Sequence, residues 1–213
     1  MRVCIAVLVL TLVVPSLLRA QVSAGALTAA LSQIRDHVVA EQTVLREKPP
    51  PAIMQKRWER TRQAVDWLIN RANRTNLADV TPAYLHALQR VAELTKKASD
   101  EQWEDAASEL EAKVEHCRRL DIGMGGTILL QINTRRTGGP VGNWQVFYLL
   151  KIYEHAAGAS PTNFPQLSTP TEAVIEPGRY WIWARDPATG KTSERVLVRV
   201  VGQKQLLVDL PVP

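Results

Sequence analysis

Two tryptophans separated by one residue form the most suggestive chemical pattern in the chain. Trp181 and Trp183 lie in the stretch PGRYWIWARDPATGKT, whose alternating side chains are typical of a β-strand. Side chains of a strand point to opposite faces in turn, so the two indoles and Arg185 share one face and the residues between them the other. An indole on such a face can stack on a sugar ring or bury against a protein.

Something is expected to cover these two indoles. Together they would form a conspicuous apolar patch on the surface of a soluble protein. The candidates are the helical half of the same chain, a second copy, a partner protein and the faces of sugar rings. The first would make the pair a structural contact, and a partner protein or a sugar would make it a binding site.

A second candidate site is a basic sector of a predicted helix. Its members are Lys56, Arg57, Arg60, Trp67, Arg71 and Arg74. At about 100° per residue, these side chains project roughly opposite the apolar stripe of the helix. Trp67 has arginines four and seven residues away, which is suitable for cation–π contacts. The sector is either an anionic or protein docking surface, or a solvated basic face near an acidic fourth helix with Trp67 buried against a neighbour.

Patterns for catalysis, metals and nucleotides are absent or incomplete. The residues from Gly190 to Thr192 match the end of a phosphate-binding loop motif. However, Arg185 occupies the position of the first glycine, and the segment joins two predicted strands rather than a strand and a helix. The four histidines lack ligand spacing, and the acids of the fourth helix are expected on a solvated face. We therefore expect no catalytic residue, no metal and no cofactor, so no enzyme, while a carboxylate pair assembled between domains stays open.

The first residues have the composition of a secretory signal peptide. Arg2 is followed by an uninterrupted apolar run from Val3 to Val14, and small residues follow the run. The run is too short for a stable membrane anchor, so residues 1–20 are expected to be removed, with cleavage as late as Ala24. We expect an exported chain, secreted or periplasmic, without a membrane span.

Composition limits the partners and the sources of stability. The chain has 26 Lys and Arg against 21 Asp and Glu, and removal of residues 1–20 takes away Arg2 and Arg19, which leaves a mild positive balance. That balance gives no argument for nucleic acid. Of the two cysteines only Cys117 would remain, on an apolar helix stripe, so we expect a small buried side chain and no intrachain disulfide.

Residues 25–120 follow helical periodicity. Apolar residues recur at steps of three and four in successive segments, and the prolines from Pro49 to Pro51 end the first of them. Thr81 followed by Pro82 predicts the start of the third helix. Ser99 and Gln102 predict a capping box at the start of the fourth. We expect an antiparallel helical bundle.

After a glycine-rich linker the periodicity changes to two. The predicted strands are Thr127 to Asn133, Trp144 to Tyr153, Glu172 to Ile175, Arg179 to Arg185, Arg195 to Val201 and Gln205 to Leu210. A hairpin turn that begins at Asp186 needs positive φ at Gly190. The predicted fold class is α+β, with a helical bundle over 25–120, a linker over 121–126 and an antiparallel β-sandwich over 127–213.

The segment from Thr169 to Val212 resembles the second half of transthyretin-like β-sandwich modules, the carboxypeptidase regulatory-like and PEGA-type domains of exported bacterial proteins. The similarity consists of a Pro-Gly turn, a Tyr strand with alternating small apolar residues, a hairpin and a closing strand. The matching positions are Pro177, Gly178, Tyr180, Ile182, Ala184, Val196, Val198, Val200, Leu206, Val208 and Leu210. The resemblance implies a sandwich with a binding or structural role, and the helical half lies outside it.

These observations predict an exported, non-catalytic binding or adaptor protein of a bacterial envelope or extracellular assembly. It would recognise a protein through the Trp181 and Trp183 face or through the Trp67 sector. The alternative is a carbohydrate- or cell-wall-binding module that accompanies a hydrolase. An enzyme with an interdomain site is a third class.

Overall fold

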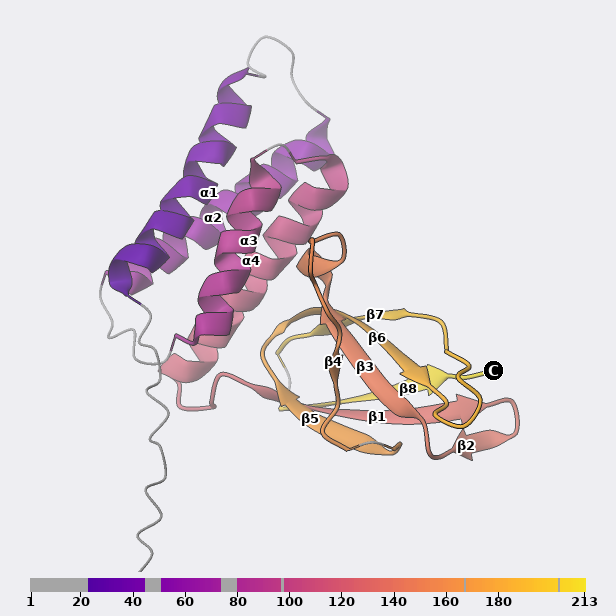
Figure 1. The fold of residues 1–213 in the computed structure, drawn as a ribbon. Helices are drawn as coiled ribbons and strands as arrows, with labels where there is room; N and C mark the ends of the chain where they lie inside the picture. Colours follow the sequence, from indigo (N-terminus) through magenta and orange to yellow (C-terminus); the bar gives the residue numbers. More distant parts are fainter. Residues whose placement is uncertain (1–22, 45–50, 74–79, 97, 167, 203) are drawn as a thin grey trace, which may run out of the picture.

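The structure is a computed structural model that describes residues 23–44, 51–73, 80–96, 98–166, 168–202 and 204–213 (Figure 1). The predicted signal peptide, Pro49, Pro50 and Arg74 lie outside these residues. Of the helices that it describes, none combines the length and the apolar composition of a membrane span.

Helices form the N-terminal half of the described chain. They are α1 (Ala24–Val44), α2 (Ala52–Ala72), α3 (Pro82–Thr95) and α4 (Asp100–Asp121). At the start of α3 the Thr81 hydroxyl accepts a hydrogen bond from the Tyr84 N–H. At the start of α4 the side chains of Ser99 and Gln102 accept from each other's backbone N–H groups. Both predicted caps are confirmed, and they satisfy N–H groups that have no partner within the first helical turn.

The apolar stripes of the helices meet in a common core. α1 packs against α2 and α3, and α4 packs against the same two helices (Figure 1). Leu31, Ile34 and Leu88 in this core have no exposed surface. Cys117 is buried beside the Tyr84 hydroxyl, 3.5 Å away, and burial raises the pKa of its thiol. The prediction of a small core side chain at this position is confirmed.

Two sheets form the C-terminal half. Their strands are β1 (Ile128–Arg136), β2 (Gly139–Val141), β3 (Gln145–Leu150), β4 (Thr162–Asn163), β5 (Thr171–Ile175), β6 (Gly178–Arg185), β7 (Val196–Val200) and β8 (Gln205–Pro211). In the β1 sheet, β1 has β8 on one side and β5 and β2 on the other. The β6 sheet has the order β4-β3-β6-β7. The predicted α+β class is confirmed, although β1 and β8 pair in parallel rather than antiparallel.

The inward faces of the two sheets share a second core. Leu130 and Ile132 of β1 and Ile182 and Ala184 of β6 have no exposed surface. Tyr180 is also buried, so alternate residues of β6 point inward as the sequence predicts. The predicted positive φ at Gly190, in the turn after β6, is confirmed as well. This turn leads to another strand rather than to a helix, which is incompatible with a phosphate-binding loop.

One predicted strand is too long. The prediction that a single strand continues to Tyr153 is wrong, because β3 stops at Leu150 and the short 3-10 helix η2 (Lys151–Tyr153) follows. Ile152 leaves the sandwich and enters the bundle core, where it is 3 % exposed. Its carbonyl accepts a hydrogen bond from Arg90 of α3. Strand periodicity contains no information about a chain that turns away to contact another part of the molecule.

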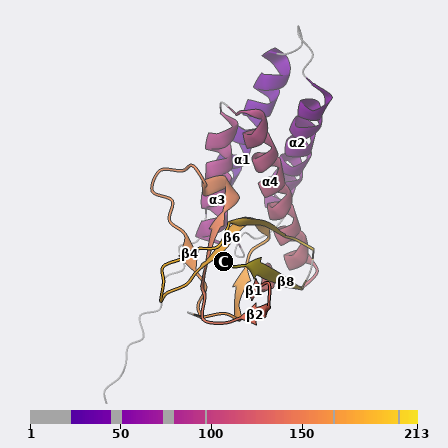
Figure 2. The same cartoon turned by 90° about the vertical axis from the view of Figure 1, so that its right-hand side faces the viewer.

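The bundle and the sandwich meet at α4, η2 and β6. α4 contacts β6 and η2, and η2 also contacts α3. Figure 2 shows the sandwich beneath the bundle, with β6 toward the helices and β1 and β2 farther away. Gly126 lies in the connection from α4 to β1, and a side chain there would collide with the His116 ring. A glycine is therefore needed where the chain passes from one half to the other.

Candidate functional site

The outer surface of the β6 sheet carries both predicted tryptophans. We define the aromatic face as the outward residues Phe147, Leu149, Trp181, Trp183, Arg185, Arg195 and Leu197. Phe147 lies opposite Trp183 on the neighbouring strand β3, and Leu197 of β7 lies opposite Trp181. Both tryptophans are half-buried, and Leu197 is 37 % exposed. The strand register therefore collects these side chains into one continuous surface.

The Trp183 indole is covered by neighbours in its own sheet. It stacks on the Phe147 ring, with ring centres 5.7 Å apart and planes inclined by 12°. The Arg195 guanidinium lies 4.7 Å from the centre of the same indole. Phe147 lies on β3 and Arg195 directly precedes β7, and β6 lies between these two strands, so the phenyl ring and the guanidinium approach from opposite sides. Both broad faces of this indole are therefore occupied, and what remains accessible is its edge.

Trp181 lies nearer the bundle. The Lys151 ammonium of η2 is 5.4 Å from the centre of its ring. Lys151 also forms ion pairs with Glu101 and Asp105 of α4, at 3.2 and 3.7 Å, and with Glu154. The Trp181 end of the face is thus covered from within the chain, by a side chain of η2 that the helical half holds through Glu101 and Asp105, rather than by a helix of that half directly.

The arginines of this sheet differ in their ionic partners. Arg179 and Arg199 face the bundle and pair with carboxylates of α4, at nitrogen–oxygen distances of 3.0 and 3.6 Å. Arg185 and Arg195 adjoin Trp183, are exposed, and have no carboxylate partner within the part of the chain that the structure describes. Uncompensated positive charge is therefore concentrated at the Trp183 end of the aromatic face.

The predicted basic sector of α2 is engaged by α4. Arg60 donates hydrogen bonds to Glu111, at 2.7 and 2.8 Å, and to Glu104. Arg71 donates to Asp121 at 2.8 Å. The pairing raises the pKa of the Arg60 guanidinium. The predicted acidic neighbour is therefore present, but these two arginines form neither a solvated face opposite the apolar stripe nor a free docking surface, because both are half-buried in ion pairs between α2 and α4. They lie at the border of the apolar stripe, from which long side chains reach the next helix.

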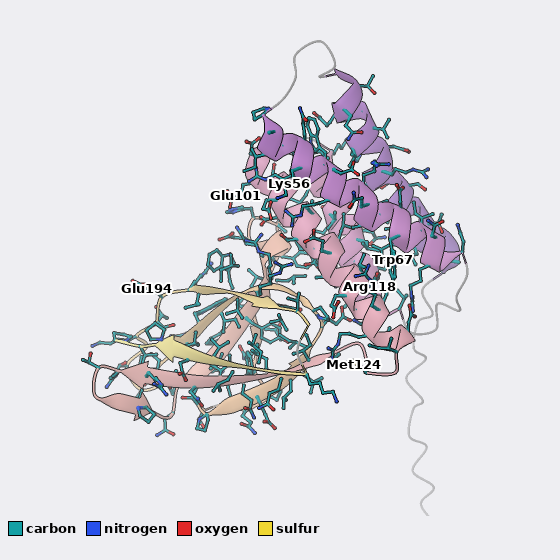
Figure 3. The ribbon with its side chains drawn as sticks, turned by 180° about the vertical axis from the view of Figure 1, so that it is seen from behind. Lys56, Trp67, Glu101, Arg118, Met124 and Glu194 are labelled. Carbon is teal, nitrogen blue, oxygen red and sulfur yellow. The ribbon has the colours of Figure 1, made fainter. Side chains whose placement is uncertain are left out.

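Trp67 lies at the same contact between α2 and α4. It packs against the bundle core, and the Arg118 guanidinium of α4 lies 5.4 Å from its ring centre (Figure 3). This cation–π partner belongs to another helix, so spacing along α2 could not identify it. Lys56 is exposed at the other end of α2, and Arg74 lies outside the described residues.

A cluster of buried and half-buried charges connects the bundle to the sandwich. We define the charged joint as Asp105, Glu109, Lys113, Lys151, Glu176 and Arg179. Lys113 and Glu109 are each 2 % exposed and lie 3.2 Å apart, and the same ammonium is 3.1 Å from Glu176. The expectation that the acids of the fourth helix are solvated is wrong for Glu109, because α4 turns this side chain toward the sandwich.

The pKa values in the charged joint shift in different directions. Burial raises the pKa of the Glu109 carboxyl. Burial acts in the same sense on Glu176, but the Lys113 ammonium outweighs it and holds that pKa below its usual value. Burial acts to lower the pKa of Lys113, and the two carboxylates raise it above its usual value. An ammonium held between carboxylates in this way is suited to fixing an interface, since loss of one partner would leave an uncompensated buried charge.

Comparison with known proteins adds no family to these observations. No family model, no curated protein and no solved structure matches the chain. Among the residues in the described ranges, no group of three or more His, Cys, Asp or Glu side chains is arranged to hold a metal ion. The aromatic face and the charged joint are therefore the features from which a function can be inferred.

Proposed function

We propose that this chain is an exported, non-catalytic binding protein that recognises another protein through the aromatic face. The observation that carries the proposal is the pair Arg185 and Arg195, exposed and without carboxylate partners among the described residues, beside Trp183 and the exposed Leu197. Arginine and aromatic side chains are enriched at protein interfaces and contribute much of their binding energy. An acidic patch on the partner would supply the missing carboxylates.

The packing of Trp183 favours a protein over a glycan as the ligand. A sugar ring binds tryptophan by stacking on a flat face of the indole, whereas Phe147 and Arg195 occupy both faces. A glycan would have to displace Arg195 before it could stack. A carbohydrate- or cell-wall-binding module accessory to a hydrolase is thus the second candidate.

The context of the face agrees with an exported adaptor. Residues 1–20 have the composition of a secretory leader, and the segment from Thr169 to Val212 resembles transthyretin-like modules of exported bacterial proteins. Such modules serve binding or structural roles and provide no catalytic residues. The bacterial cell envelope or the extracellular space is the compartment that this context supports.

Site-specific photo-crosslinking in cells tests the proposal. A photoreactive residue at position 197 is expected to form a discrete adduct with a protein other than another copy of this chain, because Leu197 lies on the aromatic face. The mass of the adduct separates the two cases. The matched position is 207, since Leu207 is an exposed leucine of the β1 sheet, 56 % exposed. The adduct should disappear in the Arg185→Glu and Trp183→Ala variants and should be absent from position 207.

Two other results would decide against a protein partner. Equal adducts from positions 197 and 207, or adducts that survive both substitutions, would show that the face is not selective. Retention of the purified protein on peptidoglycan or polysaccharide that is lost in Trp183→Ala, with no protein adduct, would replace the proposal with the carbohydrate-binding alternative.

A further inference from the structure

Each sheet of the sandwich ends in edge strands that pair on one side only, and β7 and β5 are one such strand of each sheet. Among the described residues β7 pairs with β6 alone, and β5 pairs with β1 alone. The two strands have the same length, from Val196 to Val200 and from Thr171 to Ile175. An unpaired edge presents a row of N–H and C=O groups that another strand can complete.

The outward side chains of the two edges are complementary in charge and polarity. β7 presents the exposed Leu197 and Arg199, preceded by Arg195. β5 presents the exposed Glu172 and Val174, and Val174 is 65 % exposed. An apolar side chain thus lies two residues from an arginine on one edge and two residues from a glutamate on the other.

The same charges disfavour the pairing of β7 with itself. An antiparallel β7 pair centred on Leu197 would place Arg195 of each copy opposite Arg199 of the other. Like charges directly opposite each other in a ladder are destabilising, whereas opposite charges stabilise it. Charge therefore favours the pairing of β7 of one copy with β5 of another over the pairing of β7 with itself.

The position of the bundle selects the direction of pairing. β7 runs toward the bundle, because Arg199 near its end reaches Glu111 of α4 at 3.6 Å. β5 also runs toward the bundle, because Glu176 directly after it pairs with Lys113 of α4. An antiparallel ladder would place the two bundles at opposite ends, whereas a parallel ladder would bring them side by side at one end.

We infer that this protein associates with a second copy of itself through an antiparallel ladder between β7 of one copy and β5 of the other. The paired residues are Val196 with Ile175, Leu197 with Val174, Val198 with Ala173, Arg199 with Glu172, and Val200 with Thr171. In this register the outward side chains of β7 lie opposite the outward side chains of β5. The inward side chains of the two strands then lie on one common apolar face. Because β7 and β5 are different surfaces, each of two paired copies keeps a free β5 or β7 edge, and further copies add head to tail.

Sedimentation equilibrium of the purified protein tests the association without any substitution. Five-residue ladders bury little surface, so the measurement should extend to concentrations of about 1 mM, the range of weak complexes. The average molar mass is expected to rise with concentration beyond that of a dimer. A mass that stays monomeric over the whole range overturns the inference.

Charge exchange identifies the edges. Glu172→Arg and Arg199→Glu should each weaken association by about tenfold, since each sets like charges opposite each other. The double variant restores an opposite pair and should associate like the wild type. Glu194→Arg changes the same charge outside both strands and serves as the control, with unchanged association expected (Figure 3).

Two results would assign the contact to another surface. One is association that is insensitive to the single changes. The other is association that the double change does not restore although the thermal unfolding of the protein is unaltered. Leu197 belongs to both β7 and the aromatic face, so a crosslink from position 197 to a second copy supports the ladder, whereas a crosslink to a different protein supports the proposed function.

Discussion

Glu176 is the residue through which three parts of the chain meet. It follows β5, and its carboxylate accepts hydrogen bonds from Lys113 of α4 and from the Thr81 hydroxyl at the start of α3. Burial acts to raise its pKa, but the Lys113 ammonium prevails and holds the pKa below the ordinary value of 4.5. The ionised form is therefore the one that the folded protein stabilises.

Replacement of Glu176 by Gln should produce a pH-dependent loss of stability. A depressed pKa means that the stabilisation is fully present above the unfolded value of 4.5 and is lost as the pH falls through the folded pKa. At neutral pH we expect the free energy of unfolding to fall by about 1 to 2 kcal/mol, since Lys113 keeps a second carboxylate. The difference from the wild type should shrink as the pH falls below 4.5.

Urea unfolding of both proteins from neutral pH to about pH 3 gives this difference. Asp105 and Glu109 have raised pKa values and contribute a slope of the opposite sign. The contribution of Asp105 is expected to be common to both proteins, whereas Glu176→Gln should lower the pKa of Glu109, because the Glu176 carboxylate helps to raise it. Glu194→Gln, at an exposed position outside both edge strands, is the control and should leave stability at neutral pH close to that of the wild type. A deficit in Glu176→Gln that is equally large in acid would mean that the carboxylate acts through packing rather than through its charge.

At the scale of the element, α4 depends on its capping box. The Ser99 hydroxyl accepts from the Gln102 N–H, and the Gln102 side chain accepts in return from the Ser99 N–H. Ser99→Ala should lower the free energy of unfolding by about 1 kcal/mol, since an N–H of the first turn loses its acceptor. Ser99→Asp keeps an acceptor and should remain close to the wild type. Chemical denaturation of the three proteins measures both changes, and equal losses in the two variants would show that the cap does not limit the stability of α4.

Elements whose signals are local could be predicted from the sequence. The cap at Thr81 requires only neighbouring residues, and the alternation around Ile182 requires only one strand, so both were predictable. Contacts between distant elements could not be predicted from the sequence. Arg60 of α2 binds Glu111 of α4, and the chain turns into η2 where Ile152 packs into the bundle core. The sequence of one helix does not show which element packs beside it. The environment of side chains at the border of its apolar stripe therefore could not be predicted.

At the scale of the whole molecule, the structure predicts that the bundle and the sandwich unfold together. Ile152 belongs to the bundle core although it follows a strand of the sandwich, and the charged joint adds ion pairs across the same contact. Unfolding of the bundle would expose the apolar Ile152 side chain, and unfolding of the sandwich would remove Glu176, one of the two carboxylate partners of the buried Lys113. The free energy of unfolding of either half therefore includes the free energy needed to break the contact between the halves.

Ile152→Ala should weaken that coupling as well as the total stability. We expect a loss of about 2 to 4 kcal/mol, because the truncated side chain leaves a cavity among the residues of α3 and α4. Segment-resolved hydrogen exchange under increasing denaturant should show one common transition in the wild type. In the variant, the amides of α1 to α4 should exchange at lower denaturant than those of β1 and β6, because the bundle loses a core residue and the sandwich does not. Leu207→Ala, at a side chain 56 % exposed, is the matched control and should keep the single transition. Separate transitions already present in the wild type would mean that the charged joint orients the two halves without coupling their stability.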